Sequence, residues 1–198
     1  MREIHLFYII LVYLYVKTVF SLTAIQECKP RYHYWRPYTG KIPEDAFRAG
    51  DRGDITYVAK IIPLDINSWS HAGQIGGYDY VDWGWPEKWM YRVDKFLEIL
   101  CTEPKYKRTL QWRNIYDPTD LKTTERHCCL VESGVTYRNG VAHFAYVGRK
   151  YVDNVFFVGP VYMRDDFFHP KGMFAVHARK SYYFSRDFEI LHYGCVKS

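Results

Sequence analysis

The stretch that decides the fold is YTGKIPEDAFRAGDRGDITYVAK, Tyr38 to Lys60. It reads as a turn, a short apolar patch, a glycine-rich polar turn and then a strand of β-branched and aromatic residues. After Trp112-Arg113 the chain follows the same plan a second time. A recurring plan of this kind predicts an internal repeat, which has to be identified before the fold is assigned.

Three landmarks recur in the same order along the chain. They are Trp35-Arg36 and Trp112-Arg113, YVAK (57–60) and YVGR (146–149), and FLEIL (96–100) and FEIL (188–191). The stretch from Tyr57 to Leu100 has nearly the same length as that from Tyr146 to Leu191. In contrast, the stretch from Trp112 to Tyr146 is longer than that from Trp35 to Tyr57. The extra residues include DPTDLKTTERHCC (117–129), a polar insertion that predicts a surface loop.

The composition and the local patterns favour strands. Hydrophobic residues make up 48% of the chain and aromatic residues 19%. Short β-rich segments bounded by turn residues include 54–62 and 141–151, and 153–163 follows the second of these as in a hairpin. The segment 86–100 has helical spacing, but its counterpart in the second unit is rich in strand-forming aromatic residues, so both are expected to be strands. The fold class is therefore expected to be all-β.

Each unit of short strands has an apolar face that it cannot cover alone. We expect residues 35–101 and 112–195 to form two tandem β repeats that pack on each other in a pseudo-twofold relation. Together they would make one compact domain.

The N-terminus is typical of a signal peptide. Arg2 precedes an apolar run from Leu6 to Val16, and small residues near Ser21 offer a cleavage site. The run is too short to span a bilayer, although an N-terminal membrane anchor is the alternative because Lys17 interrupts the pattern. Residues 1–21 are therefore expected to be removed from a secreted, extracellular protein whose mature chain has no membrane contact.

The five cysteines all follow this leader: Cys28, Cys101, Cys128, Cys129 and Cys195. Secretion permits disulfides, and the odd number leaves one thiol unpaired or free to link two chains in a homo-oligomer. His127-Cys128-Cys129 could also suggest a metal site, but no second ligand pair follows at a suitable spacing. Disulfides are thus expected, with no metal and no cofactor.

The distribution of charges argues against a nucleic-acid-binding protein, and the absence of catalytic motifs argues against an enzyme. The formal net charge is +5, and acidic and basic residues are interspersed, which does not favour nucleic-acid binding. Motifs of serine hydrolases, zinc proteases, phosphate-binding loops and redox pairs are absent from the sequence. Asp165 and Asp166 could suggest the acidic pair of a glycoside hydrolase. However, adjacent residues of a strand point to opposite faces, so the two carboxylates would not converge on one bond. We therefore expect a binding protein and not an enzyme.

The ordered segments GKIPEDAFRAG, TYVAK, HAGQI and FLEIL, followed by LVESG, YVGR, VGPV and FEIL, resemble the DM-nine repeat family. The resemblance covers residues 35–195. It implies a secreted or cytosolic β-rich protein, often immune-associated, and some two-repeat members are mannose-binding lectins. In those lectins the resemblance implies that an Asp of the glycine-rich turn and a later Lys hold the sugar. These positions correspond to Asp51, with Asp54 as the next choice, and to Gln74. In the second repeat they correspond to Thr136 and Pro160.

Sugar binding is also consistent with residues 71–89, HAGQIGGYDYVDWGWPEKW. This stretch combines amide and carboxylate groups with aromatic rings such as Trp85, as a site for hydroxyl groups and C–H faces requires. The alternatives are that the tryptophans pack in the core and that Asp51 is a turn residue. We expect a lectin-like protein with Asp51, Asp54, Gln74 and Trp85 as ligand residues. The other hypothesis is a secreted protein-interaction protein, such as a salivary or venom effector, that binds no sugar.

Overall fold

The computed structural model describes Cys28 and residues 32–62, 71–76, 81–85, 89–138, 141–163, 171–178 and 180–195. For residues 82–85, 89–92 and 136–138 it describes the backbone alone. The predicted signal peptide (1–21), Trp69 and Asp165-Asp166 lie outside these ranges.

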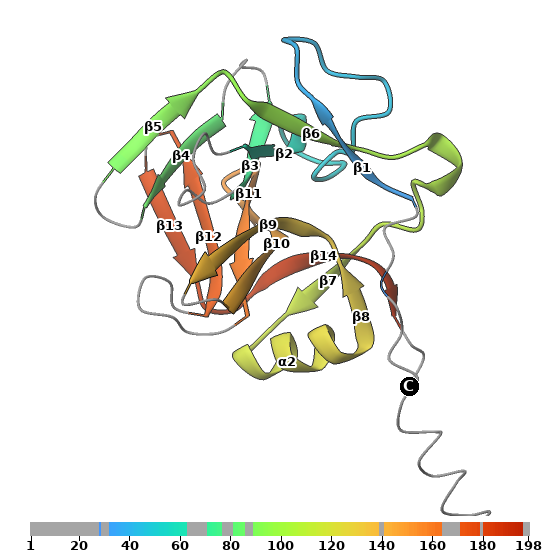
Figure 1. Cartoon of the computed structure of the whole chain (residues 1–198), viewed down its shortest axis with the longest axis vertical. Helices are drawn as coiled ribbons and strands as arrows, with labels where there is room; N and C mark the ends of the chain where they lie inside the picture. Colours follow the sequence, from blue (N-terminus) through green and yellow to red (C-terminus); the bar gives the residue numbers. More distant parts are fainter. Residues whose placement is uncertain are drawn as a thin grey trace, which may run out of the picture.

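The described chain consists mainly of antiparallel strands (Figure 1). The first half, residues 34–101, contains β1 (Tyr34–Pro37), β2 (Thr56–Ile61), β3 (His71–Gly76), β4 (Val81–Trp85), β5 (Trp89–Val93) and β6 (Leu97–Cys101). A 3₁₀ turn, η1 (Pro104–Tyr106), leads to the second half, residues 111–195. This half contains β7 (Gln111–Ile115), α2 (Pro118–His127), β8 (Cys128–Leu130), β9 (Glu132–Arg138), β10 (Val141–Val152), β11 (Val155–Tyr162), β12 (Gly172–His177), β13 (Lys180–Phe184) and β14 (Phe188–Cys195). The all-β prediction is confirmed.

The two halves have matching strand orders. One sheet runs β1-β6-β2-β3, and the larger sheet contains β7-β14-β10-β11 in the corresponding order. The registers also match, because Trp35 pairs with Leu100 as Trp112 pairs with Leu191. The recurring landmarks of the sequence therefore occupy equivalent positions. A pseudo-twofold axis relating the halves stays a prediction.

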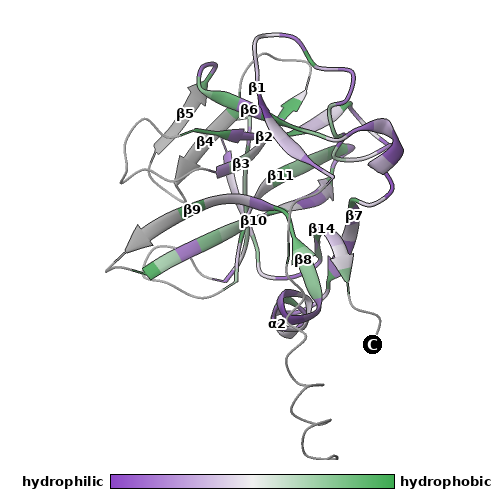
Figure 2. Cartoon of the chain, turned by 45° about the vertical axis from the view of Figure 1, so that its right-hand side comes forward, coloured by the Kyte–Doolittle hydropathy of each residue, from purple (hydrophilic) through white to green (hydrophobic). Residues whose placement is uncertain are grey.

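One hydrophobic cluster draws its buried residues from both halves. Phe47, Val58 and Leu100 of the first half pack with residues of the second half such as Val147 and Leu191. Figure 2 shows hydrophobic colour along β6, β8 and β11, whereas α2 is mostly hydrophilic. Burial of each large side chain of this kind contributes about 1.5–3 kcal/mol. The halves therefore stabilise each other through a shared core.

The strands of segment 86–100 and the hairpin at residues 141–163 agree with the sequence patterns. Segment 86–100 contains strand residues of β5 and β6, so its prediction as strand is confirmed. The strands β10 and β11 form an antiparallel hairpin, and its turn residues Asp153 and Asn154 both have positive φ. Asp and Asn tolerate this conformation better than most residues, which explains why a two-residue turn is possible there.

The prediction of a surface loop at residues 117–129 is wrong, because Pro118–His127 forms helix α2. Asp117 caps the helix by accepting from the Thr119 N–H at 2.6 Å, and Asp120 accepts from the Asp117 N–H at 3.2 Å. This reciprocal capping box satisfies amide groups that would otherwise lack partners, and proline is favoured at the first helical position. Leu121 is buried and anchors the helix.

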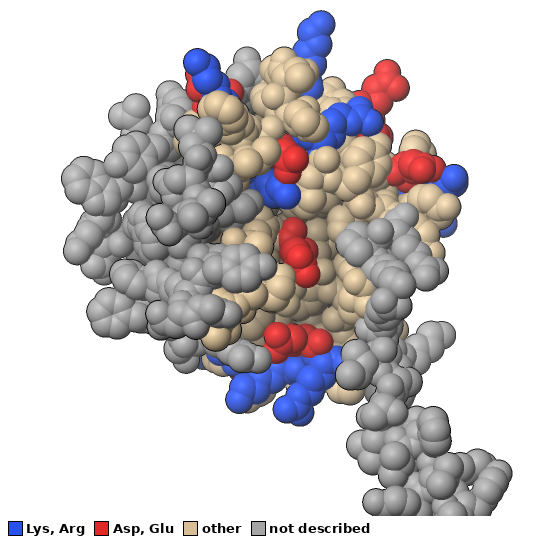
Figure 3. All heavy atoms as spheres, viewed as in Figure 1, with Lys and Arg blue, Asp and Glu red and all other residues tan. Residues whose placement is uncertain are grey.

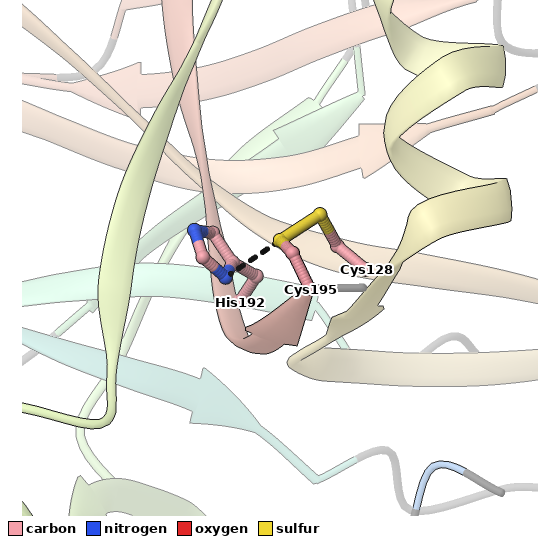
Figure 4. A group of neighbouring side chains, drawn as sticks. All are labelled: Cys128, His192 and Cys195. Atoms are coloured by element: carbon pink, nitrogen blue, oxygen red, sulfur yellow. Dashed lines mark hydrogen bonds between the residues drawn. A yellow bond between two sulfur atoms is a disulfide. The ribbon is translucent and has the colours of Figure 1, made fainter. Parts of the chain in front are cut away.

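The five cysteines form two disulfides and one free thiol: Cys28–Cys129, Cys128–Cys195 and Cys101. Figure 4 shows His192 beside the second bridge, with its Nδ1 atom 3.3 Å from the Cys195 sulfur. Disulfides are typical of extracellular proteins. Burial raises the pKa of Cys101 to about 12, so this thiol is protonated and not accessible to link two chains. A homo-oligomer stays a prediction.

Within the described ranges, no helix combines the length and the apolar composition needed to cross a membrane.

His33 precedes β1 and is expected to make stability depend on pH. Its ring lies 4.9 Å from the Tyr193 ring, and burial lowers its pKa to about 4 from 6.5. Between these pH values the unfolded chain binds the proton and the folded chain does not. The contribution of His33 is therefore complete above pH 6.5 and decreases as the pH falls toward 4.

We expect the free energy of unfolding of the native protein to fall by about 2 kcal/mol more than that of His33→Gln between neutral pH and about pH 4.5. Urea unfolding at both pH values measures this difference. Equal losses in the two proteins would contradict the assignment to His33.

Candidate functional site

The candidate site is a pocket of about 640 Å³ that both halves form, which we call the Asp51 pocket. Asp51 and Arg52 come from the glycine-rich turn that precedes β2 in the first half. The other walls come from the second half, namely from β7 and the residue after it, from β10, β11 and β14, and from the turn before β14: Asn114, Ile115, Tyr116, Arg149, Lys150, Tyr151, Phe156, Asp187, Phe188 and Glu189.

The glycine-rich turn fits closely against the β10–β11 hairpin. A Cβ atom at Gly50 would lie 2.0 Å from the Phe156 ring. Gly53 has a φ of +71°, and a Cβ atom there would lie 2.0 Å from the Asn154 carbonyl oxygen. The Asp54 N–H donates to this same carbonyl at 3.2 Å. The glycines thus allow the backbone approach that brings Asp51 to the second half.

Arg149 forms the base of the Asp51 pocket. It binds Glu189 through two hydrogen bonds, Nε to Oε2 at 2.6 Å and Nη2 to Oε1 at 2.9 Å. Its third nitrogen donates to the Ala49 carbonyl of the first half. The guanidinium also stacks on Trp112, with 4.3 Å to the ring centroid, and on Phe156 at 4.6 Å. Planar, bidentate and stacked contacts of this kind are specific to arginine.

The rim of the pocket is polar and aromatic. Arg52 lies over the Tyr151 ring, 4.4 Å from its centroid. Lys150 donates to the Asp187 carbonyl, and the Asn114 amide donates to the Tyr116 hydroxyl at 3.1 Å. Tyr116 is 65% exposed. The rim therefore presents ring surfaces next to hydrogen-bonding groups.

The formal charges of the lining residues cancel. Asp51, Asp187 and Glu189 provide three acidic groups, and Arg52, Arg149 and Lys150 provide three basic groups. Such a pocket offers acceptors and donors without a strong preference for the sign of the ligand's charge. It is chemically suited to a neutral molecule with many hydroxyl groups.

The predicted ligand residues do not all meet in this pocket. Asp51 lines it, whereas Asp54 lies beside it in the same turn with an exposed side chain. Trp85 lies in β4, and its side chain is outside the described part of the chain. Gln74 lies in β3 and is not part of the pocket lining.

Gln74 links the two halves instead. Its Oε1 accepts from the Val158 N–H at 2.9 Å, and its Nε2 lies 2.8 Å from the His177 Nδ1. In the second half Pro160 has the equivalent register, because it pairs with Val147 as Gln74 pairs with Val58. Pro160 is buried and has no polar side chain to offer a ligand.

We expect Gln74→Ala to lower the free energy of unfolding by about 2 kcal/mol, because the Val158 N–H would lose its partner in a part-buried position. Sugar binding should be unchanged. Urea unfolding and a sugar titration measure the two effects, with Gln111→Ala on exposed strand β7 as the control. Weaker sugar binding with unchanged stability would instead make Gln74 a ligand residue.

Sequence reasoning missed Arg149, Glu189 and Trp112 as parts of the site. Their signal is present in the sequence, because each belongs to a recurring landmark: YVGR, FEIL and Trp112-Arg113. The landmarks predict strands, and they also carry a cation, a carboxylate and an indole at equivalent positions of both halves. The register of β10 with β14 brings Arg149 opposite Glu189.

No protein-family model matches this chain, and a search of curated proteins found no match.

Proposed function

We propose that the protein is a secreted, lectin-like protein and that a neutral sugar binds in the Asp51 pocket. The observation that carries this proposal is the pocket's combination of balanced polar groups with aromatic surface. A sugar needs paired donors and acceptors for its hydroxyl groups and a ring surface for its C–H faces. Asp51, Arg52 and Tyr151 can supply these contacts from one rim.

The resemblance to DM-nine repeats suggests a mannose-type sugar and a role in innate immune recognition. Asp51 would accept hydrogen bonds from sugar hydroxyl groups, as the resemblance implies. Gln74 would not take part, since its amide binds Val158 and His177. The second polar contact would come instead from Arg52 or Lys150, which line the same pocket.

We also propose that the protein acts by binding and not by catalysis. The Arg149 and Glu189 side chains bind each other, and Arg149 also joins the two halves through the Ala49 carbonyl. Such paired groups are suited to a fixed recognition surface. The two disulfides support an extracellular location, consistent with a cleaved leader at residues 1–21.

Asp51→Asn tests the proposal because it keeps the size of the side chain and removes its charge. We expect at least about a tenfold loss of affinity for mannose, or for the best ligand on a glycan array, equivalent to about 1.4 kcal/mol. Intrinsic tryptophan fluorescence follows the titration.

Asp54→Asn is the matched control, since Asp54 lies in the same turn and its side chain is exposed outside the pocket. This variant should bind like the native protein. Lack of response to every sugar, or equal affinity of the Asp51 and Asp54 variants, would contradict the proposal.

A second candidate function is protein interaction, which one observation favours. Val135 and Phe144, which pair directly across the β9–β10 hairpin, are 39% and 43% exposed. Neighbouring apolar side chains on one hairpin are typical of contact surfaces. A secreted effector that binds a protein through this hairpin would be insensitive to Asp51→Asn and sensitive to Phe144→Ser.

A further inference from the structure

Lys60 repeats in the first half the arrangement that Arg149 has in the second. Its Nζ lies 2.8 Å from the Glu98 Oε2, and the same atom lies 4.5 Å from the centroid of the Trp35 ring. Lys60 pairs with Glu98 across β2 and β6 as Arg149 pairs with Glu189 across β10 and β14. Each half thus has a cation held between a carboxylate and an indole ring.

A second pocket of about 660 Å³ lies over this group, and we call it the Lys60 pocket. Trp35 and Lys60 come from the first half, whereas Glu132, Gly134 and Val135 come from the start of β9 in the second half. The Lys60 pocket therefore has nearly the size of the Asp51 pocket and, like it, is formed by both halves.

The start of β9 occupies the place of the glycine-rich turn. The N–H groups of Phe47 and Val131 donate to equivalent carbonyl groups of β6 and β14, at 2.8 and 3.0 Å. Val135 follows Val131 by four residues, as Asp51 follows Phe47, so Val135 takes the place of Asp51. The resemblance implies Thr136 for this place, which is one residue later. The two pockets are thus equivalent in construction but differ in their polar groups.

The titratable groups of the Lys60 pocket influence one another. Desolvation raises the pKa of Glu132, and Lys60 opposes this effect. Desolvation also raises the pKa of Tyr193, and Glu132 adds to the increase. The Nδ1 atom of His33 is buried without a hydrogen-bond partner in the described part of the chain. Donors and acceptors for a polar ligand are therefore present on several sides.

The charges of the Lys60 pocket differ from those of the Asp51 pocket, where the acidic and basic lining residues are equal in number. Lys60 is balanced by Glu98, and Glu132 adds an exposed carboxylate. Figure 3 shows acidic and basic groups close together on the face where β1 and β9 begin. Among the described lining residues no second cation balances Glu132, and this carboxylate disfavours an acidic ligand because like charges repel at close range.

We infer that the Lys60 pocket is a second binding site, which takes a sugar without acidic groups, and that one chain can hold two sugars at once. The sugar class rests on the proposed function, whereas the site itself rests on the equivalence of the two pockets. Within the described residues the one ion pair of Lys60 is that with Glu98, and its ammonium has three donors, so it can also donate to a sugar hydroxyl group. Glu132 supplies acceptor oxygens. Two sites on one chain would increase avidity for a surface with many sugars.

Trp35 lines the Lys60 pocket, and Trp112 lies against Arg149, which lines the Asp51 pocket. Their indole N–H signals in an NMR titration therefore report on the two pockets separately, after assignment with Trp35→Phe and Trp112→Phe. The probes are mannose, glucosamine and glucuronic acid. We expect the Trp35 signal to move with mannose and glucosamine and not with glucuronic acid. Glu132→Gln should weaken this response at least about tenfold and leave the Trp112 response unchanged. Asp51→Asn should weaken the Trp112 response and leave the Trp35 response unchanged.

An unmoved Trp35 signal with all three probes would overturn the second site, and so would an equal response in the Glu132→Gln protein. A stronger response to glucuronic acid would overturn the charge selectivity. If the Trp35 signal moves while the Trp112 signal does not, the second site holds and the proposed function of the Asp51 pocket fails. The two failures are therefore distinguishable.

Discussion

Arg149→Leu is expected to lower the free energy of unfolding by about 3 kcal/mol and to abolish binding in the Asp51 pocket. The substitution leaves Glu189 without its partner, although only 24% of that side chain is exposed. It also removes the contact with the Ala49 carbonyl, which joins the two halves. A half-buried charge that loses its partner is costly because water cannot fully replace the lost contacts.

Lys60→Leu is the matched control at the equivalent position of the first half. Lys60 makes one ion-pair contact with Glu98, at 2.8 Å, and lies over a single ring, Trp35. Glu98 also loses its partner, and only 19% of its side chain is exposed, but no contact with the other half is lost, so we expect a cost of about 2 kcal/mol. Arg149→Lys should lie between the two, since it keeps the charge but loses the bidentate contact. Urea unfolding measures all three, and equal costs for the two leucine variants would contradict the linking role of Arg149.

Gly159→Ala is expected to have the largest effect on stability, a loss of at least about 4 kcal/mol. Gly159 lies in β11, where a Cβ atom would be 1.7 Å from the Phe174 carbonyl oxygen of β12. This oxygen belongs to the backbone, so the two strands would have to separate to admit a methyl group. The separation would also disturb the neighbouring pair of Val161 with Met173.

Gly73→Ala is the comparison, because Gly73 precedes Gln74 in β3 as Gly159 precedes Pro160 in β11. A Cβ atom at Gly73 would meet the Val81 side chain, 2.4 Å from its Cγ1. A side chain can adjust better than backbone, so we expect a loss of about 2 kcal/mol. Thermal and urea unfolding of both variants test the difference. If Gly159→Ala were no more destabilising than Gly73→Ala, the close approach of β11 and β12 would be wrong.

The strands were predictable because their signal is local. β2 and β10 carry the β-branched and aromatic residues of YVAK and YVGR, and turn residues bound them. The recurrence of Trp35 and Trp112 also indicated equivalent positions, and the registers with β6 and β14 agree with this. Local patterns of this kind are sufficient to assign strands.

Helix α2 was missed although its start signal is also local. The order Asp117, Pro118, Asp120 is a capping box with proline at the first helical position. The polar composition of the segment predicts a loop, yet Leu121 and Thr124 are buried in the protein interior. Two buried positions one turn apart are enough for a short helix on the surface.

The site could be predicted only in part because it depends on contacts between distant residues. Asp51 was found through its turn, which packs on the β10–β11 hairpin through Gly53 and Asn154. Gln74 is close to Asp51 in the sequence but binds Val158 and His177 in the other half. The sequence shows neither partner, since both pairings depend on how the halves pack.

The most direct measurement of the central claim is a mannose titration of the ¹⁵N-labelled protein followed by the backbone amide signals. If a sugar binds in a pocket formed by both halves, the signals of residues 50–54 and of residues 149–154 and 187–189 should shift together with one dissociation constant. Signals that shift in only one of these segments, or shifts confined to the β9–β10 hairpin, would contradict the claim.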